Sequence, residues 1–259
     1  MTSLLATHGI SKSFGGVQAL ADCSIEVEAG SIAGLIGPNG SGKTTLFNVI
    51  TGYETADAGW VRLNGSPITN LSPDRVFGLG VGRTFQLTRV FARLTVMENM
   101  IIAADRGEHR APGRSRLLHM LAPAGGRATR RRAMELLDFT GLADHAGALA
   151  ETLSYGQRKL LELSYVLMAE PAIVLLDEPA GGINPSLVLT IADRIRELNK
   201  QGTTFLIVEH NMEFVMDLCD WLTVLDGGTA VVSGPPGKVR ADPRVLDAYL
   251  GTMEDVRGR

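Results

Sequence analysis

The chain has 259 residues, of which 45% are hydrophobic and 20% are charged, and its formal net charge is -3. The apolar content is enough for a core, which excludes a wholly disordered protein, and the length fits one large domain or two small ones. No apolar run approaches the roughly 18 residues that cross a bilayer, and no secretory signal is visible at the N-terminus. Two cysteines, Cys23 and Cys219, exclude a disulfide framework and favour a reducing cytosol.

The predicted elements of the N-terminal part are two strands and a helix. Residues 24–28 alternate between polar and apolar side chains, which predicts a strand with one buried face. A more apolar strand is predicted at 31–37, where it ends in a glycine-rich loop. A helix is predicted at 44–52.

The C-terminal part continues this alternation. Short runs rich in Ile, Val and Leu at 172–176 and 204–208 are typical of strands buried on both faces of a sheet. Between them, apolar residues fall on one face of a helix that Gly202 can end. Strand, helix and strand in this order predict a parallel sheet with crossover helices. We expect residues 86–170 to be mostly helical, and a last helix to begin after Asp242.

The charge is unevenly distributed along the chain. Residues 105–132 contain eight arginines and two acids, so this segment carries +6 and the remainder carries -9. Its proline and glycine residues predict loops around short helices. Two interpretations stay open: a solvated, partly mobile insertion, or a surface that contacts an acidic partner or anionic lipid head groups.

The glycine-rich loop carries the most specific chemical motif. Residues 37–44 match the pattern G-x-x-x-x-G-K-[ST] in full, between a predicted strand and a predicted helix. Glycines tolerate positive φ, so backbone N–H groups can surround phosphate oxygens at the positive end of the helix dipole. The lysine of such a loop contacts the β- and γ-phosphates, and the following hydroxyl binds Mg²⁺. The nucleotide-binding residues predicted here are Gly37, Pro38, Asn39, Gly40, Ser41, Gly42, Lys43, Thr44 and Thr45.

Two acids follow the apolar run at 173–176. Asp177 comes at the end of the predicted strand, where its carboxylate would hold Mg²⁺ through water. Glu178 comes next and, in an extended chain, points the opposite way, where it would polarise a water for attack on the γ-phosphate. Together with the glycine-rich loop, this pair predicts a P-loop NTPase that binds a nucleoside triphosphate with Mg²⁺.

Four further motifs, spread in order along nearly the whole chain, resemble those of ABC-type ATPases. Residues 153–157 read Leu-Ser-Tyr-Gly-Gln and resemble the family signature, with a tyrosine in place of its first glycine. Gln86 resembles the glutamine of the Q-loop, and His210 resembles the switch histidine. Phe14 lies where the family places an aromatic residue that stacks on adenine.

The resemblance implies an α/β fold, namely a P-loop NTPase core of the ABC ATPase type. This fold combines a mainly parallel sheet, an antiparallel β subdomain and a helical subdomain. We therefore expect a single ABC ATPase domain over residues 1–259. Its core would span about 1–85 and 171–259, and its helical subdomain about 86–170, with the basic insertion at 105–132.

The resemblance also implies a head-to-tail dimer, in which each nucleotide lies between the phosphate loop of one chain and the signature of the other. Ser154, Gly156 and Gln157 would then bind the nucleotide of the partner chain. The implied catalytic residues are Lys43, Gln86, Glu178 and His210, and the implied Mg²⁺ ligands are Thr44, Gln86 and Asp177. Gln86 would also link the core to the helical subdomain, which in this family grips a transmembrane partner.

Several stretches look like the ATPases of branched-chain amino acid importers, among them those around Gln86, around His210 and at 242–251. Asn184, where most ABC ATPases have aspartate, is shared with that group. Urea, amide and aromatic-acid importers and lipopolysaccharide exporters have the same features, so the solute stays open. Asn211 replaces a common aspartate, and the bulk of Tyr155 would have to point away from the nucleotide.

The implied function is an ATP hydrolase that energises a membrane importer from the cytoplasmic face of the cell membrane. Its partners would be transmembrane permease subunits, a second ATPase chain, identical or related, and a periplasmic or extracellular solute-binding protein. No nucleic acid is expected as a partner. The alternatives are the ATPase of a lipopolysaccharide-type exporter and a soluble ABC ATPase that acts on DNA or ribosomes. A plain P-loop kinase would leave residues 154–157 and His210 unexplained.

Overall fold

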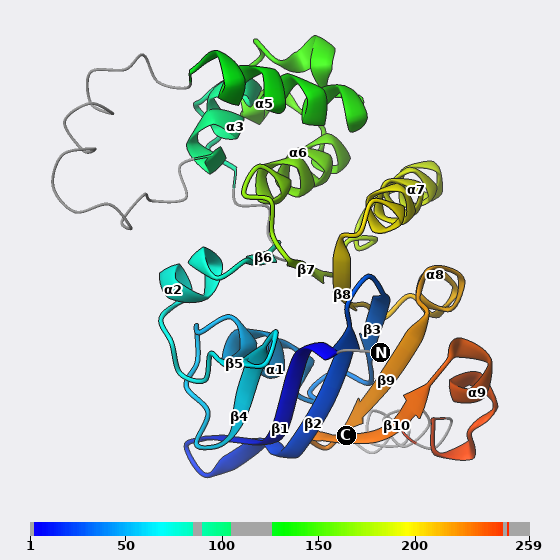
Figure 1. Ribbon diagram of the computed structural model, residues 1–259. Helices are drawn as coiled ribbons and strands as arrows, with labels where there is room; N and C mark the ends of the chain where they lie inside the picture. The colour runs from blue at the N-terminus through cyan, green and yellow to red at the C-terminus, as the bar shows by residue number, and fades with distance from the viewer. Residues whose placement is uncertain (1–2, 85–89, 105–125, 246–247, 249–259) are drawn as a thin grey trace, which may run out of the picture.

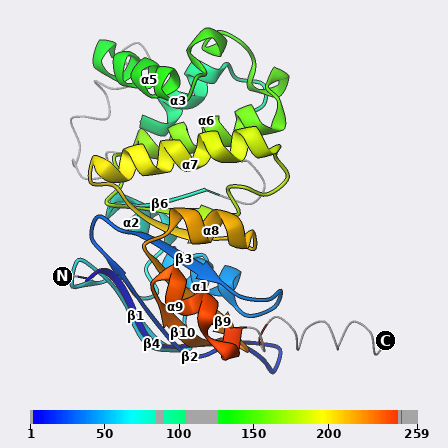
Figure 2. The same cartoon turned by 90° about the vertical axis from the view of Figure 1, so that its right-hand side faces the viewer.

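The computed structural model of the chain describes residues 3–84, 90–104, 126–245 and 248. Figure 1 shows two bodies that meet in the middle of the molecule: strands gather in the lower body and helices in the upper one. Figure 2 shows the same layering from the side, with the helical body above and strands below.

An antiparallel sheet lies at the lower edge of the molecule in both views. Its strand order is β2-β1-β4-β5, and its strands are β1 (Ser3–Phe14), β2 (Val17–Glu28), β4 (Ala58–Leu63) and β5 (Ser66–Pro67). In β2, Ile25 and Val27 are buried and the residues beside them are exposed. The strand predicted at 24–28 is confirmed and forms the last part of a longer one.

The central sheet has the strand order β10-β9-β3-β8-β7-β6. Neighbouring strands run parallel, except that β10 is antiparallel to β9. The strands predicted near 31–37, 172–176 and 204–208 are confirmed as β3, β7 and β8, three of the four inner strands. The strands of this sheet are β3 (Ile32–Ile36), β6 (Val81–Arg83), β7 (Ile173–Asp177), β8 (Thr204–Val208), β9 (Trp221–Asp226) and β10 (Thr229–Gly234).

The helices are α1 (Lys43–Ile50), α2 (Pro73–Gly78), α3 (Val96–Ala104), α5 (Arg127–Phe139), α6 (Tyr155–Leu167), α7 (Pro185–Lys200), α8 (Met212–Leu218) and α9 (Pro236–Ala241). Short 3-10 turns lie at Ala143–His145 and Ala150–Thr152. The end of α7 is set as predicted, because Gly202 has φ +99 and stops the helix. The last predicted helix begins at residues 243–245, and most of its course lies outside the described residues.

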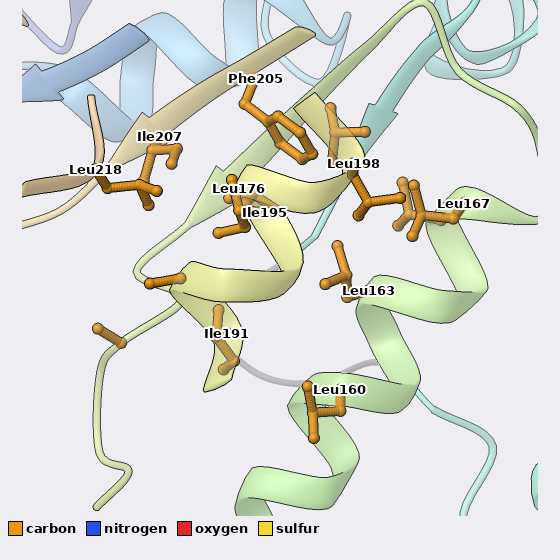
Figure 3. Packing of buried hydrophobic residues seen from close by; sticks show 14 of the residues in the cluster. Leu160, Leu163, Leu167, Leu176, Ile191, Ile195, Leu198, Phe205, Ile207 and Leu218 are labelled. Atoms are coloured by element: carbon orange, nitrogen blue, oxygen red, sulfur yellow. The ribbon is translucent and has the colours of Figure 1, made fainter. Parts of the chain in front are cut away.

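The central sheet separates two hydrophobic clusters, because successive side chains of a strand point to opposite faces. In β8, Phe205 and Ile207 belong to the cluster of the helical side, whereas Leu206 and Val208 belong to the cluster around α1 and the antiparallel sheet. Figure 3 shows the first cluster, in which leucines and isoleucines of α6 and α7 pack together beside Phe205. All five residues of β8 are buried, as in a strand covered on both faces.

Residues 127–132 form the last part of the basic insertion that the structure describes. They begin α5, a helix of 13 residues that follows Gly126, in agreement with the mostly helical structure expected for residues 86–170. Its arginines are exposed, and Arg131 and Arg132 lie 3.9 and 3.7 Å from Glu135, while Leu136 and Leu137 are buried. Exposed pairs of this kind contribute little stability, so the buried face anchors the helix. Residues 105–125 lie outside the described part of the chain. Among the described residues, no helix is long and apolar enough to span a membrane.

Candidate nucleotide site

The phosphate loop leaves the C-terminal end of β3 and leads into α1. Gly42 has φ +101, a conformation that L-residues with side chains rarely adopt, and it directly precedes the helix. A Cβ atom added to Gly42 would lie 2.6 Å from the carbonyl oxygen of Ala19. The backbone of the loop therefore packs directly on β2, and only glycine fits there.

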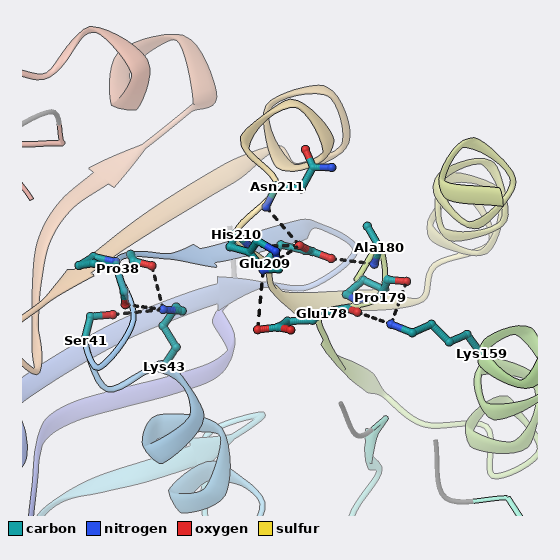
Figure 4. Close-up of polar contacts among 11 residues, drawn as sticks. Pro38, Ser41, Lys43, Lys159, Glu178, Pro179, Ala180, Glu209, His210 and Asn211 are labelled. Carbon is teal, nitrogen blue, oxygen red and sulfur yellow. Dashed lines mark hydrogen bonds and ion pairs between the residues drawn. The ribbon is translucent and has the colours of Figure 1, made fainter. Parts of the chain in front are cut away.

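Lys43 lies across the loop that precedes it (Figure 4). Its Nζ donates hydrogen bonds of 2.8 Å to the carbonyl oxygens of Gly37 and Pro38. Burial lowers the pKa of Lys43, and the nearby carboxylates of Glu178 and Asp177 act in the opposite direction. The predicted lysine and both predicted acids are thus close enough in the structure for their charges to interact.

Asp177 ends β7 as predicted and is buried. Its Oδ2 lies 3.1 Å from Nη2 of Arg83, at the end of the neighbouring strand β6. Arg83 also donates to the side chains of Asn48 in α1 and of Thr51, the residue that caps its C-terminal end, at 2.8 and 3.0 Å. Burial raises the pKa of Asp177, and Arg83 opposes this shift. The arginine therefore fixes the position of the carboxylate relative to α1.

Glu178 does not continue the strand as an extended residue, which corrects the sequence-based expectation. Its φ is +48, and its backbone N–H donates to the carbonyl oxygen of Val208 at 2.9 Å. Oε1 of Glu178 lies 3.7 Å from Nδ1 of His210, and this histidine side chain is 62% exposed. The two predicted hydrolytic residues thus lie side by side at the edge of the sheet.

The signature residues Ser154 and Gln157 form a capping box at the start of α6. The backbone N–H of Gln157 donates to Oγ of Ser154 at 3.2 Å, and the N–H of Ser154 donates to Oε1 of Gln157 at 2.9 Å. Nε2 of Gln157 also contacts Nε2 of His145 at 3.0 Å. The Ser154 hydroxyl only accepts in the box, so its hydrogen can still be donated to a phosphate oxygen.

Gly156 and Tyr155 pack against the chain that leads into α7. A Cβ atom added to Gly156 would overlap the side chain of Leu187. A Cβ atom added to Gly182 would lie 3.2 Å from the ring of Tyr155, whose ring also lies 5.5 Å from Nζ of Lys159. The bulk of Tyr155 is therefore accommodated between α6 and this loop.

Two asparagines that depart from the family pattern cap helices. Oδ1 of Asn184 accepts from the N–H of Leu187 at 2.9 Å and from the hydroxyl of Ser186 at 2.8 Å, at the start of α7. Oδ1 of Asn211 accepts from the N–H of Phe214 at 3.1 Å, at the start of α8. Asparagine and aspartate are equally good N-caps, which explains both replacements structurally.

The remaining predicted residues differ in how far the structure places them. Thr44 is exposed in the first turn of α1, and Thr45 beside it is partly exposed. Phe14 ends β1 with 44% of its surface exposed, as a stacking residue requires, and its ring lies 5.2 Å from Nζ of Lys12. Gln86 lies outside the described residues, so its predicted role stays a prediction.

The donor atoms fit a nucleoside triphosphate with Mg²⁺. A hydroxyl at the start of α1 and a carboxylate at the end of β7 are oxygen ligands, which Mg²⁺ prefers. Among the described residues, no three His, Cys, Asp or Glu side chains gather so that they could hold a metal ion. A cation here would therefore need phosphate oxygens or water as further ligands, as Mg²⁺ commonly has.

Sequence reasoning missed three charged residues around this site, namely Arg83, Lys159 and Glu209. Glu209 is completely buried and accepts from the N–H groups of Ala180 and His210, at 2.7 and 3.0 Å. The position of Glu209 directly after the apolar run of β8 is the sequence signal that could have indicated a buried, hydrogen-bonded carboxylate, because an acid is rarely buried without partners.

Comparison with known proteins agrees with this geometry. The family model described as ABC transporter matches residues 20–181, and the one described as branched-chain amino acid ATP-binding cassette transporter matches residues 231–255. The high-affinity branched-chain amino acid transport ATP-binding protein LivG of Salmonella typhimurium is 38% identical over 96% of this chain and 98% of its own length. The probable LivG of Archaeoglobus fulgidus is 37% identical over 97% and 96%.

A solved structure gives the same result for the fold. The ADP conformation of MJ1267, an ATP-binding cassette of an ABC transporter, matches with a TM-score of 0.84 and 36% identity, over 97% of this chain and all of that one. The expected α/β fold of the ABC ATPase type is thereby confirmed. Because the first family model spans more than half of the chain and the relatives align over nearly all of it, the chain belongs to the ABC transporter family, as one of its ATP-binding cassettes.

Proposed function

We propose that this cassette hydrolyses ATP to drive a membrane importer for branched-chain amino acids or related small solutes. The observation that carries the proposal is the placement of Lys43, Asp177, Glu178 and His210 at one edge of the central sheet. The solute class rests on the LivG relatives, whose names give branched-chain amino acid transport.

Each residue has a proposed role in hydrolysis. Lys43 stabilises the charge that develops on the phosphates, and Phe14 stacks on the adenine. Thr44, Asp177 and Gln86 hold Mg²⁺, which supplies charge neutralisation on the phosphate oxygens when it is bound. Glu178 positions the attacking water and takes its proton.

His210 and the signature complete the proposed site. The imidazole of His210, next to Glu178, donates a hydrogen bond to the γ-phosphate. Ser154, Gly156 and Gln157 serve the nucleotide of a second chain, since the N-terminus of α6 offers free N–H groups and a positive dipole end. A head-to-tail pair of chains, identical or related, therefore binds two nucleotides at its interface.

A groove beside β6 is the proposed contact with the permease subunit. It is lined by residues of α2, β6 and α6, and by the exposed rings of Tyr53 and Phe91. Exposed aromatic residues are typical of protein interfaces. Arg83 also lines this groove and reaches Asp177, so a segment bound here would be one residue away from the proposed Mg²⁺ site.

The first test measures ATP turnover and assembly of the purified chain at saturating ATP and Mg²⁺. Lys43→Ala should lower turnover at least about 100-fold, because the phosphates lose a preorganised cation. Glu178→Gln should retain ATP and remain a dimer in size-exclusion chromatography. Lys200→Ala, at the exposed end of α7, is the control and should keep full turnover. Unchanged turnover in Lys43→Ala, or a monomeric Glu178→Gln chain, would contradict the proposed site.

The second test identifies the partners and the solute. Affinity purification from detergent-solubilised membranes should recover polytopic membrane proteins. The recovered complex in proteoliposomes should take up labelled leucine, isoleucine or valine when its solute-binding protein is added. Recovery with ribosomes would contradict the importer and favour a soluble ATPase, and outward transport of a lipid would favour an exporter.

A further inference from the structure

Two buried charged side chains flank the segment from Glu178 to Ala180 without belonging to any motif used above. Glu209 is completely buried and Lys159 is 9% exposed. Figure 4 shows Lys159 reaching this segment from α6, and Glu209 reaching it from the end of β8. Buried charges are costly unless they are paired and hydrogen-bonded, so their contacts should indicate their role.

Glu209 connects the segment after Glu178 with the switch histidine. Its Oε1 accepts from the N–H of Ala180 at 2.7 Å. Its Oε2 accepts from the N–H groups of His210 and Asn211, at 3.0 and 3.2 Å. Hydrogen bonds from backbone N–H groups to a carboxylate are stronger than neutral ones. A single side chain therefore sets the distance between two loops that carry candidate hydrolytic residues.

Lys159 holds the same segment from the opposite side. Its Nζ donates to the carbonyl oxygens of Glu178 and Pro179, at 2.5 and 3.4 Å. Burial lowers the pKa of Lys159, while the acids around it, foremost Glu209, raise it. Lys159 thus supplies a positive charge among several acids, and it belongs to α6, the helix that begins within the signature.

The conformation of Glu178 requires such support. A residue with a side chain at φ +48 is strained, and such strain persists only where the surrounding structure holds it. The carbonyl oxygen of Glu178 is held by Lys159, and the N–H two residues later is held by Glu209. We infer that Lys159 and Glu209 are positioning residues that fix the backbone at Glu178 and keep its carboxylate beside His210.

This inference rests on the proposed hydrolytic roles of Glu178 and His210, and it predicts a specific kinetic signature. Loss of either positioning residue lets φ of Glu178 relax, which separates its carboxylate from His210. The phosphate loop is built on β3 and α1 and does not depend on these contacts. The rate of hydrolysis should therefore fall while the binding of ATP stays nearly unchanged.

The experiment compares Glu209→Gln and Lys159→Met with Glu213→Gln, an exposed control in α8. An amide at 209 presents an NH₂ group to backbone donors, and methionine keeps the length of Lys159 without its hydrogens. Both variants should lower kcat about tenfold or more, with KM for ATP within about threefold of the parent. Lys159→Arg, which keeps a donor, should recover part of the rate.

The combined variant separates a positioning role from a merely structural one. Because both residues hold one segment, the double variant should lose much less than the product of the two single losses. Folded single variants with kcat within twofold of the parent, or fully multiplicative losses, would overturn the inference. If Glu209→Gln does not fold, as judged by circular dichroism, Lys159→Met decides alone. A parent chain and Glu213→Gln control without ATP turnover would instead refute the proposed function.

Discussion

The phosphate loop and the signature each place a glycine at the start of a helix, but different parts of the chain hold the two motifs. Gly42 of the loop is packed on the backbone carbonyl of Ala19. Gly156 of the signature is packed on the side chain of Leu187, and side chains also cap its helix. The nearest contact of Gly42 is therefore a main-chain atom that no substitution of a neighbour removes, with the side chain of Leu20 next to it, whereas Gly156 and the start of its helix are fixed by side chains.

This difference explains why one motif matches its pattern in full and the other departs from it. Main-chain packing leaves no room for another residue at Gly42. Around the signature, the ring of Tyr155 finds space beside Gly182, a glycine with φ +71. A motif supported by side chains can change together with its neighbours, so its sequence is less strictly determined.

The largest expected effect tests this comparison at the two glycines. Gly42→Ala should lower the free energy of unfolding by about 2–4 kcal/mol and abolish ATP binding, because it adds a clash with Ala19 to an unfavourable φ. Gly40→Ala has φ +81 but open space around its Cβ, so it measures the cost of φ alone. Urea unfolding and ATP titration provide both readouts. Equal losses in the two variants would show that main-chain packing does not constrain the loop.

Gly156→Ala provides the other half of this comparison. This variant should lower the free energy of unfolding by about 1–3 kcal/mol, since the new methyl group displaces the side chain of Leu187. A second substitution, Leu187→Ala, should remove that clash and give a favourable coupling energy in the double-mutant cycle. Additive losses would contradict the proposed side-chain support of the signature.

A smaller effect is expected at the capping box. Gln157→Ala removes the acceptor for the N–H of Ser154 and should cost about 1 kcal/mol in urea unfolding. Gln157→Glu keeps an acceptor at this position and serves as the matched control. If Gln157→Ala lowers the free energy of unfolding no more than Gln157→Glu does, the capping box does not stabilise α6.

The smallest effect uses the cysteines, one in each hydrophobic cluster. Cys23 belongs to the cluster on the phosphate-loop side and Cys219 to the cluster of the helical side. Burial raises the pKa of both thiols from 9.0 to about 12. The folded chain therefore keeps protons that the unfolded chain loses, so this stabilisation is nearly full at pH 8, begins to fall as the pH approaches 9, and is lost as the pH rises to 12.

Between pH 8 and 9, the free energy of unfolding should decrease by about 0.4 kcal/mol for each thiol. Cys23→Ala and Cys219→Ala should each remove one share of this decrease, which urea titration at several pH values measures. Thiol labelling at pH 8 should require unfolding, and single-cysteine chains then report which cluster opens first. Labelling of the folded chain at the rate of a free thiol would contradict the burial of that cysteine.

The parts of the molecule that the sequence predicted well depend on local patterns. The apolar runs of β7 and β8 and the glycine at 202 determine strands and a helix end from neighbouring residues alone. The phosphate loop was predicted for the same reason, because its residues are contiguous. The family resemblance then identified Phe14, Ser154 and His210 as candidate site residues, because they follow the order of the family's motifs. Their roles in ATP hydrolysis stay predictions.

The parts that the sequence did not reveal depend on contacts between distant segments. Nothing near Arg83 in the sequence indicates that it binds Asp177, which lies 94 positions later. The φ of +48 at Glu178 results from the turn after β7, and an extended chain was a wrong assumption there. Asn211 had no explanation until α8 showed that it is an N-cap.

Helix α6 would connect the two nucleotide sites of the proposed dimer. Its first residues would face the nucleotide of the partner chain, and Lys159, five positions after Ser154, holds the carbonyl group of Glu178 in its own chain. At 1.5 Å per residue, these two points lie about 8 Å apart on one rigid rod. A shift of α6 when one nucleotide binds would move Lys159 and, with it, the carbonyl group of Glu178, the residue proposed to hydrolyse the other nucleotide. The proposed hydrolytic residue of one site would then respond to the nucleotide of the other site through a helix inside its own chain.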